Sequence, residues 1–321
     1  MKNTLIITCS LALIAASSAC NKKPNYTRII LPAWGTTCEV IYENKNDDNL
    51  IKSIDSLFQE LSLSFSNYDS NSIIAGINLN NSLYIDKHLL ALLELSQYLF
   101  KVSNGNFDPT IFPLVKHWGF MNKQGLWADT NMIDSMLVNV GLTKWSWTNR
   151  EIKSKPTQGK IDFNAVAPGY AADIIALFLK EKGINNFYIN NGGELVLSGN
   201  NKFNKPWNIG ITDPLKVDQG DTIFSISNIS MATSGNYRNY FSHKGIKYGH
   251  TIDTKTGYPK QTNIISATVF AKSAALADGY ATICMTMNLT EVLLFLKKEN
   301  LMAYLIYETS GGVNKCFIPH I

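Results

Sequence analysis

The sequence predicts an α+β protein with largely antiparallel sheets and flanking helices. Segments with the alternating hydrophobic pattern of strands mix with segments at helical spacing, without the strict strand–helix–strand order of a parallel sheet. No internal repeat, low-complexity segment or change of composition divides the 321 residues. We therefore expect a single domain with a well-filled core.

The first residues have the pattern of an export signal. Lys2 is followed by an apolar run from Leu5 to Ala16 and by small residues ahead of Cys20. This run is shorter than the roughly 20 apolar residues of a membrane span, and small residues before a cysteine suit cleavage with lipid attachment. The chain would then be lipid-anchored to a bacterial membrane through Cys20, facing the periplasm or the cell exterior. An ordinary signal peptide that happens to contain a cysteine is the alternative. We expect a lipoprotein signal over residues 1–19, a tether over 20–30 and the folded domain over 31–321.

A strand, two amphipathic helices and an irregular segment follow in that order. The strand lies between Leu31 and Tyr42, and apolar residues at helical spacing run from Leu50 to Leu61. The second helix begins at Asp86, a good N-cap, and ends at Asn104-Gly105. Because residues 104–120 contain two prolines and an Asp-Pro step, we expect no regular element there but an irregular surface of aromatic side chains.

The second half of the chain continues the mixture of helices and strands. A polar run at residues 218–221 predicts an exposed loop, and the pair Gly192-Gly193 after a buried strand indicates close approach of the backbone to a neighbour or ligand. We expect helices over 129–140, from Pro168 to Gly183, from Ser273 and from Thr290, and strands over 160–165, 187–190, 207–214, 266–271, 301–307 and 312–318.

Charge and cysteine content argue against nucleic-acid binding and against a cysteine-based metal or redox site. The formal charge of +4 is small and no basic run accompanies it, which argues against nucleic acid as the main partner. Cys38, Cys284 and Cys316 form no C-x-x-C and no metal-ligand spacing, so buried free thiols are expected. One disulfide stays open as an alternative in an exported protein.

The stretch from Met231 to Pro259 carries the densest chemistry in the chain. Thr233-Ser234-Gly235 offers small side chains and backbone N–H groups, which let a loop approach a phosphate, and Arg238 can pair with an anionic group. A tight turn after Asp253 is expected to return His250 beside this loop. A Gly-rich hairpin whose polar residues only satisfy turns is the alternative.

A second polar pair follows on an expected helix. Asp278 and Thr282 are four residues apart, so they share one helical face. A carboxylate and a hydroxyl so placed suit a hard, oxygen-preferring cation. Taken alone, such a pair is more often a local hydrogen bond.

These stretches resemble motifs of the ApbE-type flavin transferases, which are FAD:protein FMN transferases. Residues 231–259 resemble S-T-S-G-x-Y-R-x-Y followed by H-x-I-D-P-x-T-G-x-P, with Ala232 where Ser is frequent and Thr254 where Pro is usual. Residues 65–78 resemble S-x-Y-x-x-x-S-x-I-x-x-x-N, and residues 104–120 resemble G-G-x-F-D-x-T-x-x-P-L-v-x-x-W-G-F.

Three more segments continue the resemblance in the family's order. Residues 161–173 resemble L-D-l-g-g-i-A-K-G-y-a-v-D, residues 191–194 resemble N-x-G-G-d, and Asp278 and Thr282 stand in A-D-x-x-x-T. Pro168 departs from the pattern, because the family usually carries Lys or Glu there. Whatever that side chain contributes to FAD binding is then missing.

The resemblance implies an ApbE-like fold of two intertwined lobes around an FAD cleft. It implies Mg²⁺-dependent transfer of the FMN moiety of FAD to a Thr or Ser hydroxyl of an acceptor flavoprotein, such as a subunit of a membrane redox complex. The product is a phosphodiester, AMP leaves, and His250 is the general base. Mg²⁺ would be held by Asp278, Thr282 and the backbone carbonyl of Ala165. The residues expected to bind FAD are Trp34, Tyr68, Asn106, Phe107, Asp108, Asp162, Thr233, Ser234, Gly235, Arg238 and Ile252.

Three alternatives stay open at this point. The protein can be an Mg²⁺-dependent FAD pyrophosphatase that gives FMN and AMP, because water can replace the acceptor hydroxyl. It can also be a non-catalytic FAD-binding lipoprotein, which the Pro168 departure favours. His250, finally, can be a structural histidine bonded to Asp253.

Overall fold

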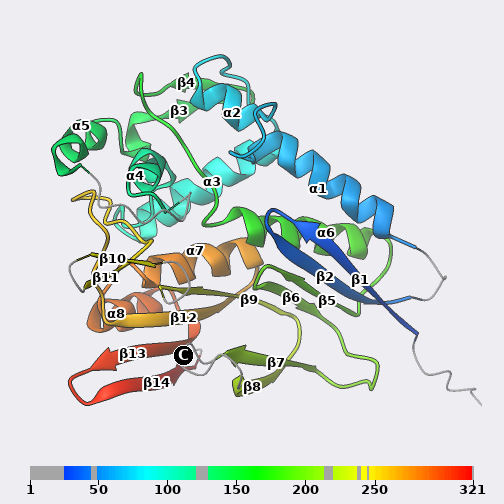
Figure 1. Cartoon of the computed structure of the whole chain (residues 1–321). Coiled ribbons are helices and arrows are strands. Elements are labelled where there is room, and N and C mark those ends of the chain that lie inside the picture. The colour runs from blue at the N-terminus through cyan, green and yellow to red at the C-terminus, as the bar shows by residue number, and fades with distance from the viewer. Residues whose placement is uncertain are drawn as a thin grey trace, which may run out of the picture.

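An eight-stranded antiparallel sheet runs through the computed structural model (Figure 1). The structure describes residues 25–44, 49–120, 129–212, 220–236, 240–243 and 246–319. The strands of the large sheet lie in the order β1-β2-β5-β6-β9-β12-β13-β14, and every neighbouring pair is antiparallel. These strands are β1 (Tyr26–Ala33), β2 (Thr36–Glu43), β5 (Phe187–Asn191), β6 (Glu194–Ser198), β9 (Ile229–Gly235), β12 (Ile264–Ala271), β13 (Met302–Thr309) and β14 (Gly312–Ile318).

The described residues also form three two-stranded sheets and eight α-helices. The pairs are β3 (Ser146–Trp147) with β4 (Ile152–Ser154), β7 (Trp207–Thr212) with β8 (Gly220–Ile226), and β10 (Tyr240–His243) with β11 (Ile246–Gly249). The helices are α1 (Ile51–Phe65), α2 (Ile73–Asn78), α3 (Lys87–Val102), α4 (Phe112–His117), α5 (Ile133–Leu137), α6 (Ala167–Glu181), α7 (Ala274–Cys284) and α8 (Leu289–Lys298).

The two faces of the large sheet carry different layers. Helices α6 and α7 pack on one face, with α1 and α3 outside them, and the β7–β8 hairpin lies on the other side (Figure 1). Alternation along β9 explains how one strand serves both layers: Met231 belongs to the core under β7, whereas Ala232 is fully buried and points the other way. Along β7, Trp207, Ile209 and Ile211 are buried in this second core.

Two lobes interlock where the C-terminal half of the chain packs into the helical part. The Trp118 indole donates to the carbonyl of Gly257 at 2.8 Å, and the Thr254 hydroxyl donates to the carbonyl of Gly105 at 2.6 Å. Trp118 is completely buried in a small cluster with Ile252. The expected α+β fold of two intertwined lobes is therefore confirmed.

The helix ends follow the capping residues of the sequence. The Asp86 carboxylate accepts from the backbone N–H groups of His88 and Leu89, so α3 starts where expected. The Ser273 hydroxyl caps α7 in the same way by accepting from Leu276. These side chains replace intrahelical partners that the first turn lacks.

Several expected elements differ from the structure. Residues 104–120 do contain regular turns, a 3₁₀ turn at Pro109–Ile111 and α4, because both prolines stand in first turns, where a missing N–H costs nothing. Residues 160–165 form no strand. Their backbone is held instead by loop and side-chain partners: the Ile161 N–H donates to Asn78 and the Asp162 N–H to the carbonyl of Pro109.

Three boundaries also differ. Residues 220–226, expected to begin as a loop, form β8, whose pairing with β7 places Phe224 beside the second core. The expected helix over 129–140 is only a 3₁₀ turn followed by the short α5. The sheet begins at Tyr26, ahead of the expected domain start at residue 31.

The expected export signal and most of the tether lie outside the described residues. Within the described residues, no helix has the length and apolar character needed to cross a membrane. The three cysteines of the described chain, Cys38, Cys284 and Cys316, form no disulfide with one another.

Candidate active site

Two cavities meet at three of the predicted residues, Ser234, His250 and Asp278, which line both. The first cavity, of about 550 Å³, lies between the helical lobe and the loop around His250. The second, of about 570 Å³, lies between the large sheet and β7. Predicted residues that line the first cavity are Trp34, Tyr68, Asn106, Phe107, Asp108, Asp162, Ala165, Ser234, His250, Ile252, Asp278 and Thr282.

A glycine places Asp278 at this junction. The N-terminal turn of α6 touches that of α7 so closely that a Cβ on Gly169 would lie 2.4 Å from the carbonyl oxygen of Ala274. The Gly169 N–H points at the Asp278 carboxylate, with a long N–O distance of 3.4 Å. One turn along α7, the Thr282 hydroxyl lies 3.5 Å from the Ser234 hydroxyl of β9. Sheet and helix thus bring three oxygen groups into one corner.

Without a positive charge nearby, the ionised forms of the carboxylates in this corner are unfavourable. Burial, and next the charges of Glu194 and Asp173, raise the pKa of Asp278 well above its usual range. Burial also raises the pKa of Glu194 to about 7 and that of Asp173 to about 6. The Asp173 carboxylate accepts backbone N–H groups of Ala274 and Ala275, at 2.8 and 2.9 Å. The buried Asp278 and the partly buried Glu194 therefore form the pair of carboxylates that most needs a positive charge.

The residues present fit a hard divalent cation at Asp278. The corner offers a carboxylate and two hydroxyls, and Ala165 lines the same cavity from the loop ahead of α6. In the part of the chain that the structure describes, no three His, Cys, Asp or Glu side chains gather as a ligand group. A cation here would therefore depend on hydroxyl and carbonyl oxygens as well as on Asp278.

The hydroxyls of Thr233 and Ser234 have different neighbours. Adjacent residues of a strand point to opposite faces, and Ser234 faces Thr282 whereas the Thr233 hydroxyl lies 2.7 Å from that of Thr268 on β12. Thr233 and Gly235 line only the second cavity. All three neighbours therefore line the second cavity, and only Ser234 also lines the first.

Aromatic side chains form the mouth of the first cavity. Trp34 sits in a left-handed turn with φ of 45°, donates its indole N–H to Ser62 at 2.7 Å, and packs edge-on against Phe58 and Phe65. The Tyr68 side chain is 69% exposed, so its ring is available to a ligand. Phe107 and Ile252, both almost fully buried, line the deeper wall with the partly buried Asn106.

Two of the three acids that line this cavity, Asp108 and Asp162, accept hydrogen bonds from neighbouring parts of the chain. Asp108 accepts from the N–H and hydroxyl of Thr110 and from the N–H of Leu142, so both of its oxygens have partners. Burial raises its pKa. Asp162 accepts from the Asn67 amide at 2.9 Å and the Asn164 N–H at 3.2 Å, and burial raises its pKa to about 6. Both acids hold the cavity wall in place.

His250 lies at the junction of the two cavities. Its ring is 6.5 Å from that of Phe120, measured between centroids, in an edge-on arrangement. The Asp253 carboxylate forms an ion pair with Lys260 at 2.7 Å and accepts the N–H groups of Lys255 and Thr256. Asp253 therefore stabilises the turn after His250.

The sequence did not indicate one residue of the site, Glu194, whose charge raises the pKa of Asp278. A carboxylate between two buried strands is itself the signal that points to it. Arg238 lies outside the described residues. The pairing between β6 and β9 ends at Leu195 and Met231, whereas β9 continues to Gly235. Glu194, the first residue of β6, therefore lies just beyond this pairing.

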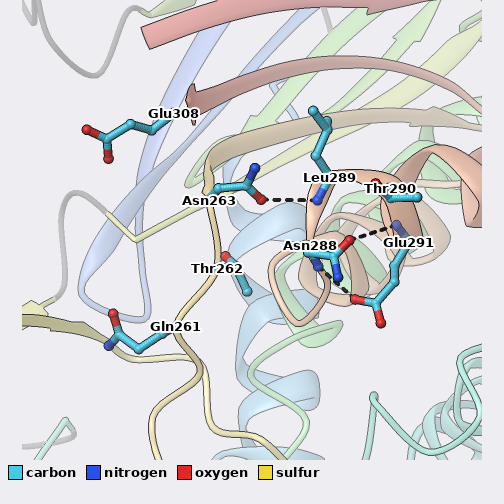
Figure 2. A pocket seen from close by; sticks show the side chains of 8 residues that line it. All are labelled: Gln261, Thr262, Asn263, Asn288, Leu289, Thr290, Glu291 and Glu308. Carbon is cyan, nitrogen blue, oxygen red and sulfur yellow. Dashed lines mark hydrogen bonds between the residues drawn. The ribbon is translucent and has the colours of Figure 1, made fainter. Parts of the chain in front are cut away.

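A third hollow, at the N-terminus of α8, contains none of the predicted residues (Figure 2). The Asn263 side chain accepts the Leu289 N–H, and Asn288 and Glu291 form a reciprocal capping box. The carboxylates of Glu291 and Glu308 line the same hollow, so it does not favour an anion. It is a capped helix end and not a second active site.

Comparisons with known proteins agree with this geometry. The family model described as the ApbE family matches residues 34–306. An FAD:protein FMN transferase of Vibrio cholerae is 28% identical over 323 residues, covering 97% of this chain and 96% of that protein. The FAD:protein FMN transferase of Buchnera aphidicola is 31% identical over 266 residues, covering 78% of each.

Solved structures show the same fold. Flavin transferase ApbE from Vibrio cholerae superposes with a TM-score of 0.83 at 25% identity, over 92% of this chain and 97% of that one. The apo form of the Pseudomonas stutzeri flavinyl transferase ApbE gives 0.85 at 25% identity, over 94% and 96%. Since the family model spans most of the sequence and the structures agree along nearly their full length, the chain belongs to the ApbE family.

Proposed function

We propose that this protein, a flavin transferase of the ApbE family, transfers the FMN moiety of FAD to a Thr or Ser hydroxyl of an acceptor flavoprotein and releases AMP. The observation that carries the proposal is the meeting of two cavities at Ser234, His250 and Asp278. A transfer reaction needs a donor and an acceptor on two sides of one reacting atom. A junction of two cavities supplies that arrangement.

The first cavity suits FAD. Its volume of about 550 Å³ falls within the ordinary range for ligand sites, and its wall combines aromatic and apolar side chains with a few polar groups. Trp34 and Tyr68 at its mouth offer ring faces and edges to a flat heterocycle. The phosphates then lie at the inner end, toward Ser234 and Thr282.

Each residue at the junction has a separate role in the proposed reaction. His250 accepts the proton of the attacking hydroxyl. The hydroxyl oxygen forms a bond to the FMN phosphorus, the bond from that phosphorus to the bridging oxygen breaks, and AMP leaves with the electron pair. The Ser234 hydroxyl positions a phosphate oxygen. Mg²⁺, held by Asp278, Thr282 and the Ala165 carbonyl, would neutralise charge on the phosphates.

The test uses the full protein with FAD and Mg²⁺, with and without membranes from host cells that lack it. We expect AMP release together with a flavin-fluorescent protein band that survives a denaturing gel. Steady AMP and FMN release that is independent of the membranes, with no labelled band, would show a pyrophosphatase. Tight FAD retention without AMP would show a non-catalytic binder.

We also propose that the protein is exported and lipid-anchored through Cys20. The apolar run and the small residues ahead of that cysteine support the proposal. Growth with radioactive palmitate should label the wild-type protein and leave Cys20→Ser unlabelled. Equal labelling of both forms would contradict a lipid at Cys20.

A further inference from the structure

We propose that the second cavity is the docking groove of the acceptor, and that an extended segment of the acceptor lies along the free edge of β7 with its hydroxyl directed to His250. The inference rests on the proposed function and names the place where the second substrate binds. The groove ends at the junction residues Ser234, His250 and Asp278, so a ligand in it reaches the same reacting atom as FAD.

Strand β7 forms one wall of the groove along most of its length. Consecutive residues from Asn208 to Thr212 line the cavity, which corresponds to roughly 15 Å of extended chain. The opposite wall contains Thr36 and Thr37 at the start of β2 and the turn at Gly192-Gly193. A groove with a strand on one side suits an extended peptide.

The edge of β7 that faces the groove is the one away from β8. None of the described residues of β8 lines the cavity, although β7 and β8 pair along their whole length. Among the described strands, β7 pairs with β8 alone. An exposed edge of this kind binds a peptide by adding it as another strand, with backbone hydrogen bonds giving affinity.

The charge of the groove argues against a second phosphate-bearing ligand. Besides Asp278, its lining includes the carboxylates of Glu194 and of Glu39, which pairs with Arg28, and no lysine or arginine occurs among the described residues that line it. Other lining groups, such as those of Asn190 and Asn208, are neutral and polar. Nucleotide phosphates would find no lysine or arginine among these lining residues, whereas a neutral peptide backbone needs none.

The relation of the two cavities also fits the direction of attack. A phosphoryl group is attacked in line, with the incoming oxygen opposite the leaving one. If FAD fills the cavity around Trp34 and Phe107, the acceptor hydroxyl has to arrive from another side. The groove along β7 provides that route to His250.

A bulky residue at Gly210 tests the groove. This glycine lies mid-way along β7, and a Cβ built on it meets nothing within 4 Å, so a side chain can be added without disturbing the hairpin. We expect Gly210→Phe to lower kcat/KM for the acceptor at least about tenfold while the Kd for FAD stays within about twofold. Acceptor labelling is measured by flavin fluorescence in gels with the host membranes as the acceptor source, and FAD binding by fluorescence titration.

A matched control adds the same bulk to the neighbouring strand. Ser225 is exposed on β8, is paired with Asn208, and does not line the groove, so Ser225→Phe should behave as the wild type. Asn208→Trp on β7 is a second groove variant, in case Gly210→Phe fails to fold. Melting curves decide whether each variant is folded.

The outcomes separate this inference from the proposed function. Acceptor labelling at the wild-type rate by a folded Gly210→Phe or Asn208→Trp protein would overturn the groove. A groove variant that loses FAD affinity as strongly as acceptor labelling would assign the cavity to FAD and would also overturn it. If the wild-type protein itself labels no acceptor, the proposed function fails and takes the docking groove with it.

Discussion

The hydroxyl oxygens of Ser234 and Thr282 lie 3.5 Å apart across the contact between β9 and α7, although 48 positions separate them in the sequence. This contact fixes the corner in which Asp278 is buried. It also shows that the Ser234 hydroxyl of β9, and not that of its neighbour Thr233, faces α7. The predictions below depend on that corner.

Replacing Asp278 by Asn should abolish Mg²⁺-dependent turnover and raise the melting temperature of the metal-free protein at neutral pH. Asn keeps an oxygen for the Gly169 N–H but removes the charge that burial and Glu194 oppose. In a chain of this size, 1 kcal/mol corresponds to about 2 °C. AMP release and thermal melts in EDTA measure the two effects. Full activity in the variant would refute the metal assignment.

The stability of the metal-free protein should fall as the pH rises from about 4 to about 7. The pKa values of Asp162 and Asp173 are raised to about 6 and that of Glu194 to about 7, so the native state binds more protons than the unfolded chain in this window. The contribution is complete below the ordinary carboxyl pKa and is lost above the raised values.

Mg²⁺ should counteract this loss. A cation that binds the ionised carboxylate of Asp278, as proposed, should raise the melting temperature more at pH 8 than at pH 5. Melting curves across pH, with Mg²⁺ and with EDTA, measure both trends. An equal effect of Mg²⁺ at the two pH values would contradict a carboxylate-bound cation.

Replacing His250 by Ala should slow flavin transfer about 10²- to 10⁴-fold, the usual range for a general base, and leave FAD binding nearly unchanged. The wall that suits FAD is formed chiefly by other residues, among them Trp34 and Phe107. Single-turnover rates and FAD titrations separate the two effects. An unchanged rate would return His250 to a structural role.

Replacing Ser234 by Ala should lower turnover, whereas Thr233→Val should mainly lower stability. The Thr233 hydroxyl pairs with that of Thr268, which is buried, and removing one partner leaves the other unsatisfied at a cost of about 1–3 kcal/mol. Denaturant unfolding and AMP release give the comparison. Equal loss of FAD affinity in both variants would show that the two hydroxyls share one ligand.

Adding a methyl group at Gly169 should reduce both stability and turnover. A Cβ there would lie 2.4 Å from the carbonyl oxygen of Ala274, so α6 would have to move away from α7, which carries Asp278. Overpacking of this kind costs about 1–3 kcal/mol. Gly210→Ala is the matched control, because the space beside Gly210 is open. Wild-type behaviour of Gly169→Ala would show that this close approach is not needed.

Local signals in the sequence predicted much of the fold. Asp86 and Ser273 cap the helices that they were expected to start, and the 3.6-residue spacing that placed Asp278 and Thr282 on one face also places both at the cavity. Such features depend only on neighbours in the chain. Each family motif is likewise a run of neighbouring residues.

Features that depend on distant partners could not be predicted. The irregular path of residues 160–165 is set by Asn78 and Pro109, which lie far away in sequence. Asp108 lines the first cavity, and its hydrogen bond from the Leu142 N–H comes from a residue 34 positions away. The proximity of Glu194 to Asp278 follows from strand order, which no local pattern shows.

The central position of β9 determines when the enzyme can become competent during synthesis. This strand pairs with β6 on one side and with β12 on the other, and Asp278 follows β12. A nascent chain still lacking residues 264–282 carries the aromatic cavity wall but neither the second neighbour of β9 nor the carboxylate. Ribosome-attached intermediates should therefore release no AMP from FAD until residues 264–282 have emerged.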